Sequence, residues 1–144
     1  MNTSAKIFLA GCCVLALPAA ALADTITLSA TLDGANETAG GHADGSGMFS
    51  AEIDTESGDV CYVLAVEGIG DPVAAHIHDG AAGKDGKPVV TIDVTGEDED
   101  RCIAVEPDTL KPIVAAPANF YVNVHTAQYP KGAVRGQLET VTED

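Results

Sequence analysis

The chain has four histidines, whose imidazoles can bind a metal ion or transfer a proton. Of the four, His76 and His78 stand two positions apart, at the end of an apolar run and just before Gly80. Side chains alternate between the faces of a β-strand, so both imidazoles would share one face. His125 lies in a second alternating segment, residues 119–126. If the two strands are neighbours, three imidazoles converge on the outer side of one sheet and could bind copper, zinc or nickel.

The same histidines also fit roles that involve no metal. An H-x-H pair occurs on solvated strand faces, where imidazoles bond to each other or to a turn. His42, in a glycine-rich loop, would be a fourth ligand only if that loop folds over the trio. Tyr121, Asn123 and Arg135 are expected on the same face as His125, turned away from the core, where they could support a ligand. Arg135 could equally form a salt bridge with an acidic side chain.

Composition narrows the choice of partners. The 144 residues include 22 acidic and seven basic ones, with a net charge of −15 when histidines are neutral. Such a surface repels nucleic acid and anionic lipid, so the expected partners are cations, neutral molecules or basic proteins. Hydrolase motifs such as G-x-S-x-G and H-E-x-x-H are absent, and we assign no catalytic residue.

The first 23 residues have the pattern of a signal peptide. Lys6 precedes an apolar core at 7–17, and residues 21–23, Ala-Leu-Ala, form a small-x-small cleavage site. The apolar stretch is too short to span a membrane. We expect a mature chain of residues 24–144 in the periplasm or secreted, with a net charge of −16 because Lys6 is the one charged residue removed. Residues 9–12 also resemble a lipoprotein cleavage box that would leave a lipidated Cys12, although the apolar core would then follow the cut.

Only two cysteines, Cys61 and Cys102, remain after the signal peptide. An even pair in an exported chain predicts a disulfide. Closing a loop of 41 residues would stabilise the fold by about 4 kcal/mol on the chain-entropy model.

Alternating hydrophobic patterns recur at short intervals and indicate the fold class. They predict strands at 25–32, 48–53, 60–66, 73–78, 88–94, 101–105, 119–125 and 133–141, with one or two helical turns within 108–116. The prediction is a single all-β domain, a Greek-key-like sandwich or barrel of about eight short antiparallel strands.

Two segments together resemble a known family. The first is residues 75–80, AHIHDG, followed by 86–90, GKPVV; the second is 121–126, YVNVHT, followed by 130–138, PKGAVRGQL. Both are similar to the signatures of the CHRD domain, named after chordin, and the resemblance extends over residues 25–141. It implies an exported β-domain, found in animals in an extracellular growth-factor antagonist and in bacteria as small exported proteins. It also makes the histidine trio look like a family feature, and it supplies no catalytic residue.

The leading hypothesis is an exported, non-catalytic protein that binds copper through His76, His78 and His125. Imidazole-only ligation in an oxidising compartment favours copper over zinc. One alternative is a protein-interaction module without a metal. Another is an enzyme, because the histidine pattern is similar to that of copper-dependent superoxide dismutases. The acidic charge argues against the enzyme, since superoxide is an anion.

Overall fold

The computed structural model describes residues 25–142, which form one antiparallel sheet with a short helix. The strands, in chain order, are β1 (Thr25–Asp33), β2 (Ser46–Asp54), β3 (Asp59–Glu67), β4 (Pro72–Asp79), β5 (Pro88–Ile92), β6 (Arg101–Ala104), β7 (Phe120–Thr126), β8 (Val134–Gln137) and β9 (Glu139–Thr140). The helix α1 covers Pro107–Ala115, and two single-turn 3-10 helices, η1 and η2, cover Gly34–Asn36 and Pro117–Asn119.

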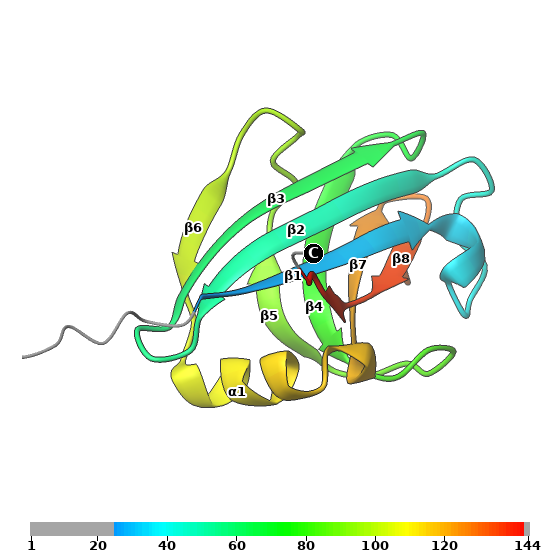
Figure 1. Cartoon of the computed structure of the whole chain (residues 1–144). Coiled ribbons are helices and arrows are strands. Elements are labelled where there is room, and N and C mark those ends of the chain that lie inside the picture. The colour runs from blue at the N-terminus through cyan, green and yellow to red at the C-terminus, as the bar shows by residue number, and fades with distance from the viewer. Residues whose placement is uncertain (1–24, 143–144) are drawn as a thin grey trace, which may run out of the picture.

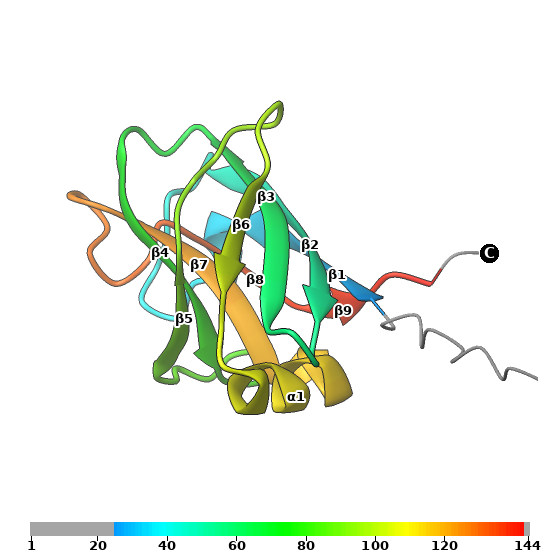
Figure 2. The ribbon, with the colours of Figure 1, turned by 90° about the vertical axis from the view of Figure 1, so that its left-hand side faces the viewer.

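The sheet has the order β5-β4-β7-β8-β1-β2-β3-β6, and β9 pairs with β1 outside this path. Figures 1 and 2 show the sheet curled into a half-barrel, with β1, β2 and β3 on one side and β4, β5 and β7 on the other. Helix α1 lies across one end of the curl. The prediction of an all-β, antiparallel fold with about eight main strands is confirmed; the strands form one curled sheet.

The core lies inside the curl and follows from the alternation of the strands. In β1 and β2 the inward residues pair across the strands, with Leu28 opposite Ala51 and Ala30 opposite Phe49. Helix α1 adds Leu110 and Ile113 to this core, and both are fully buried. Burial of large apolar side chains stabilises such a fold by about 1.5–3 kcal/mol per residue.

The C-terminal strand differs from its prediction. The pattern predicts one strand over 133–141, whereas the structure has β8 and β9 separated by Leu138. Leu138 is buried, and its N–H donates to the carbonyl of Phe120. This bond is to the first residue of β7; beyond it β9 pairs with β1, with Ser29 opposite Glu139.

Cys61 on β3 and Cys102 on β6 are directly paired across the strands and form the expected disulfide. The signal-peptide prediction and the lipoprotein option at Cys12 fall on residues 1–24, outside the described residues. Within residues 25–142, no helix has the length and apolar character needed to cross a membrane.

Candidate metal centre

Three neighbouring strands bring the predicted site residues together. Strand β7 pairs with β4 on one side and with β8 on the other. In this register Asn123 lies between His76 of β4 and Arg135 of β8, and Tyr121 lies opposite His78. Inward-facing neighbours such as Ile77 belong to the core, so these polar side chains share the opposite face of the sheet. We call this surface of β4, β7 and β8 the site face.

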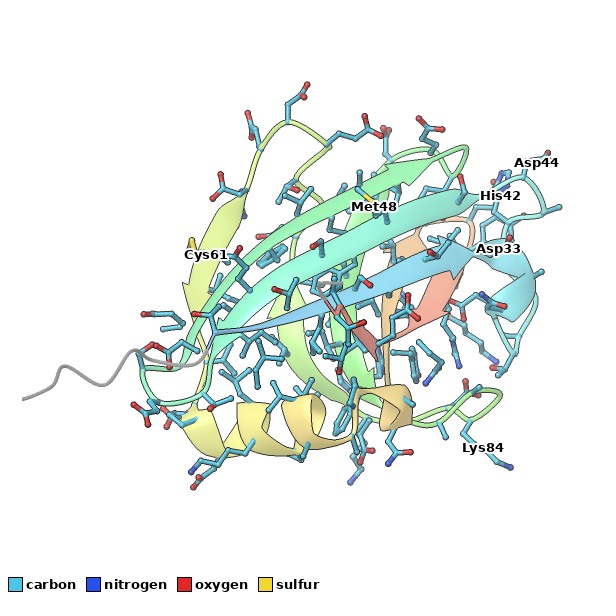
Figure 3. All side chains as sticks on the ribbon, viewed as in Figure 1. Asp33, His42, Asp44, Met48, Cys61 and Lys84 are labelled. Carbon is cyan, nitrogen blue, oxygen red and sulfur yellow. A yellow bond between two sulfur atoms is a disulfide. The ribbon has the colours of Figure 1, made fainter. Side chains whose placement is uncertain are left out.

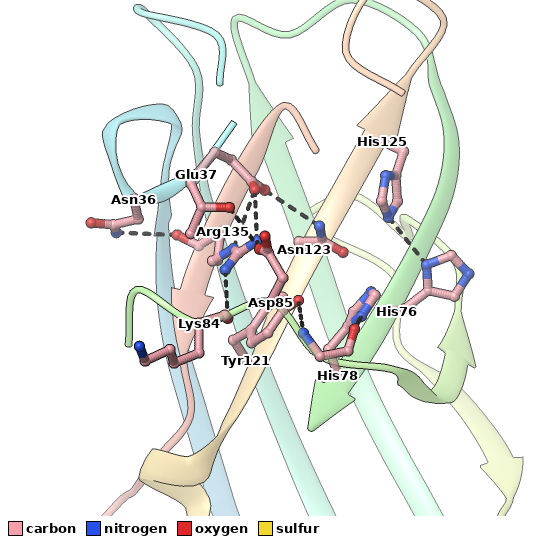
Figure 4. A network of polar contacts seen from close by, with 12 residues as sticks. Asn36, Glu37, His76, His78, Lys84, Asp85, Tyr121, Asn123, His125 and Arg135 are labelled. Atoms are coloured by element: carbon pink, nitrogen blue, oxygen red, sulfur yellow. Dashed lines mark hydrogen bonds and ion pairs between the residues drawn. The ribbon is translucent and has the colours of Figure 1, made fainter. Parts of the chain in front are cut away.

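The three histidines predicted as ligands meet on the site face (Figure 4). One nitrogen of each imidazole lies within 4.8 Å of the corresponding nitrogens of the other two. Nδ1 of His76 and Nε2 of His125 are 3.2 Å apart. A metal ion needs several histidine, cysteine or acidic side chains close together. Within residues 25–142, this trio is the group whose ligand atoms lie close enough to share one ion.

Two backbone carbonyls determine which ring nitrogens carry hydrogen. Nδ1 of His78 lies 2.9 Å from the carbonyl oxygen of Gly86, and Nδ1 of His125 lies 3.1 Å from that of Pro130. A carbonyl oxygen only accepts, so in each ring Nδ1 must be the donor and Nε2 carries the lone pair. The same arrangement, with a backbone carbonyl behind each imidazole, orients histidines in metal sites.

His76 and His125 are partly shielded from water, and this burial favours their neutral form. Burial lowers the pKa of His76 below its ordinary value, and charge on His125 and His78 would lower it further. Burial also lowers the pKa of His125, although its hydrogen bond to the Pro130 carbonyl opposes the shift. Neutral rings have lone pairs that can bind a cation.

The site face is more enclosed than the sequence suggests. Tyr121, Asn123 and Arg135 point away from the core as predicted, but they are buried, and His78 is only 8% exposed. Within the trio, His78 is buried, whereas His76 and His125 remain half-exposed. Two loops cover this face: residues 34–45, held by the bond from Gly34 N–H to the Gly45 carbonyl, and residues 80–87, which return to β4.

Of the two roles expected for Arg135, support of a bound ligand or a salt bridge, the structure has the salt bridge. Its guanidinium bonds Glu37 at 3.1 Å, Asp85 at 2.8 Å and the carbonyl of Lys84 at 3.1 Å. Glu37 is buried, and its pKa is raised because desolvation outweighs the attraction of Arg135. Sequence reasoning missed Glu37, since it lies in an irregular loop 98 positions from its partner and no periodicity marks it.

Tyr121 connects this ion pair to the trio. Its ring stacks on His78 with centroids 4.8 Å apart, and the Arg135 guanidinium carbon lies 4.0 Å from the Tyr121 ring centroid. The Tyr121 hydroxyl also accepts the N–H of Gly86. Tyr121 therefore fixes both the position of His78 and the loop whose carbonyl orients that imidazole.

His42, predicted as a possible fourth ligand, is not brought to the trio. Its ring packs against Tyr129 with centroids 5.3 Å apart, and its Nδ1 accepts the N–H of Asp44. His42 is not a member of the group of potential ligands found on the site face.

A pocket of about 500 Å³ adjoins the trio and opens to solvent. Its walls combine His78 with the buried polar residues of the site face and with charged loop residues. The lining residues are Thr38, Ala39, His78, Asp85, Gly86, Tyr121, Asn123, Lys131 and Arg135.

Comparison with known proteins identifies the domain. The family model of the CHRD domain matches residues 28–138, which include every strand from β2 to β8 and all three histidines of the trio. No curated protein and no solved structure matches the chain. The expected resemblance is thus confirmed over most of the described residues, and the chain belongs to the CHRD-domain family.

Proposed function

We propose that this CHRD-domain protein binds one copper ion through His76, His78 and His125 and has no catalytic activity of its own. Three imidazoles on two paired strands supply the ligands. Backbone carbonyls of Gly86 and Pro130 orient two of these rings, Tyr121 stacks on His78, and a solvent-open pocket lies at one side of the trio.

One observation carries the metal proposal. Nε2 of His78 is buried and has no hydrogen-bond partner among the described residues. Because Nδ1 of the same ring donates to Gly86, this nitrogen holds a lone pair directed into the protein. An unsatisfied buried acceptor costs about 1–3 kcal/mol. A cation shared with His76 and His125 would satisfy it.

The choice of copper rests on the donor set. An all-imidazole group binds copper more tightly than other divalent first-row ions. Zinc, which also takes imidazole ligands, is the second choice. No aspartate or glutamate belongs to the trio's group of potential ligands, so the donors do not favour calcium or magnesium.

We also infer that the protein is exported and acts in the periplasm or outside the cell after removal of residues 1–23. The disulfide between Cys61 and Cys102 supports this inference, because such bonds persist in oxidising compartments. An exported protein would meet copper in the same oxidising compartment.

The test is calorimetric titration of Cu(II) and Zn(II) into the purified, metal-free, disulfide-bonded protein. We expect one-to-one copper binding that weakens at least about 100-fold when His76, His78 or His125 is changed singly to alanine, because losing a ligand costs more than the roughly 10- to 100-fold caused by losing an outer-shell partner. The matched control is His42→Ala, which removes a histidine outside the trio and should leave the affinity unchanged. Weak binding of several ions, insensitive to the trio, would contradict the proposal.

A further inference from the structure

Asn123 is the most deeply buried polar residue of the site face, at 1% exposure. Its amide nitrogen lies 3.4 Å from Oε1 of Glu37. Glu37 forms an ion pair with Arg135, so its oxygens act as acceptors and the atom facing it must be the amide N–H. The orientation of the Asn123 side chain is therefore determined by chemistry.

The carbonyl oxygen of Asn123 consequently points the other way. Figure 4 shows this Oδ1 atom on the side of the histidines, and His76 is the direct cross-strand neighbour of Asn123. Oδ1 is buried and lacks a hydrogen-bond partner among the described residues. The structure thus has two unsatisfied acceptors on one face, this oxygen and Nε2 of His78, and both residues line the same pocket.

The two acceptors need different partners. The imidazole nitrogen can be satisfied by copper. An amide oxygen suits calcium, magnesium or manganese rather than copper, so in a copper site a hydrogen-bond donor satisfies it better. A metal ion that carries a water molecule would satisfy both acceptors. The ion would bind the imidazole nitrogens, and the water would donate a hydrogen bond to the amide oxygen. Three protein ligands leave such a fourth position open in many imidazole-bound metal sites.

We propose that Asn123 Oδ1 accepts a hydrogen bond from a water molecule in the fourth position of the ion held by the trio. Asn123 thereby makes this position select ligands that carry a hydrogen over bare anions. This inference rests on the proposed copper site. Asn123 acts here as a positioning and specificity residue, and the pocket beside it is the route by which small ligands enter.

The first experiment uses copper-loaded wild-type protein in water enriched in oxygen-17. Pulsed electron paramagnetic resonance should detect coupling between Cu(II) and the oxygen-17 nucleus of one bound water. Absence of this coupling in protein that holds one copper ion would overturn the inference.

The second experiment compares azide binding, followed by its charge-transfer absorption, in loaded wild-type protein and the Asn123→Leu variant. Azide has no hydrogen to donate, and its negative charge would face the lone pair of Asn123 Oδ1. Removing this oxygen should therefore raise azide affinity about tenfold. The control is Asn36→Leu, because Asn36 is exposed, donates only to the Arg135 backbone carbonyl and does not line the pocket beside the trio. Unchanged azide affinity in Asn123→Leu would contradict the inference.

The outcomes separate the two proposals. If copper fails to bind one-to-one or ignores the histidines, the copper site itself is wrong. If copper binds through the trio but either the oxygen-17 coupling or the azide effect is missing, only the role of Asn123 is wrong.

Discussion

At the scale of single residues, hydrogen bonds from ring nitrogens to backbone carbonyls prepare the trio for a ligand. The carbonyl oxygens of Gly86 and Pro130 accept hydrogen bonds from Nδ1 of His78 and His125, so Nε2 of each imidazole keeps its lone pair. Ordering of this kind lowers the entropy that a bound ion would otherwise remove from the side chains. The histidines are therefore preorganised by atoms that no sequence motif specifies.

The ion pair beneath the loops gives a stability prediction at this scale. Glu37→Gln removes the buried partner of Arg135 and should lower the free energy of unfolding by roughly 3–5 kcal/mol. Asp85 bonds the same guanidinium nitrogen, but its side chain is 70% exposed. Asp85→Asn should therefore destabilise the protein far less, because water screens an exposed charge. Urea unfolding of both variants is the measurement, and equal losses would contradict a dominant role for Glu37.

At the scale of elements, the loop between β4 and β5 connects the site to the sheet. Its residue Gly86 contacts both His78 and Tyr121 through backbone atoms, while Lys84 and Asp85 contact Arg135. The loop is therefore a structural part of the proposed centre, although it supplies none of the proposed ligands.

Substituting Gly86 tests this connection. A methyl group there would collide with the backbone carbonyl of Asp79, so Gly86→Ala must displace the loop. We expect copper affinity to fall about 10- to 100-fold because His78 loses its orienting carbonyl. Gly83→Ala in the same loop is the control: its Cβ would meet nothing within 4 Å, and only its φ of +73° is unfavourable. It should cost about 1–2 kcal/mol in stability and leave calorimetric copper binding unchanged.

The sequence predicted the elements of the site better than their surroundings. Alternation places His76 and His78 on one face, and the pairing of β4 with β7 brings His125 to them. Burial of Arg135 could not be predicted, because the loops that cover it lack any periodic pattern. The pairing of Glu37 with Arg135 depends on contacts between segments far apart in the chain, which local spacing does not encode.

At the scale of the whole molecule, the disulfide and the candidate metal centre lie in different parts of the sheet. The disulfide joins β3 to β6 at one edge, whereas the trio belongs to β4 and β7, near the other. Figure 3 shows Cys61 at the opposite end of the molecule from Lys84, whose carbonyl contacts Arg135 of the site face. Stability and ion binding should therefore be separable.

Removing the disulfide tests this separation. The double variant Cys61→Ser, Cys102→Ser should lose about 4 kcal/mol of unfolding free energy, because the unfolded chain regains the freedom of a long loop. Copper affinity of the folded variant should match that of the wild type. Urea unfolding and calorimetry would measure the two quantities. A large loss of affinity in the folded protein would show that the two regions are coupled.

In the proposed site His76, His78 and His125 together hold one copper ion. Pulsed electron paramagnetic resonance of the protein loaded with one equivalent of Cu(II) would count these ligands, since the remote nitrogen of each coordinated imidazole modulates the signal. We predict modulation from three imidazoles, reduced to two in each single His→Ala variant. A spectrum with fewer imidazoles in the wild type, or one unaffected by these variants, would contradict the account.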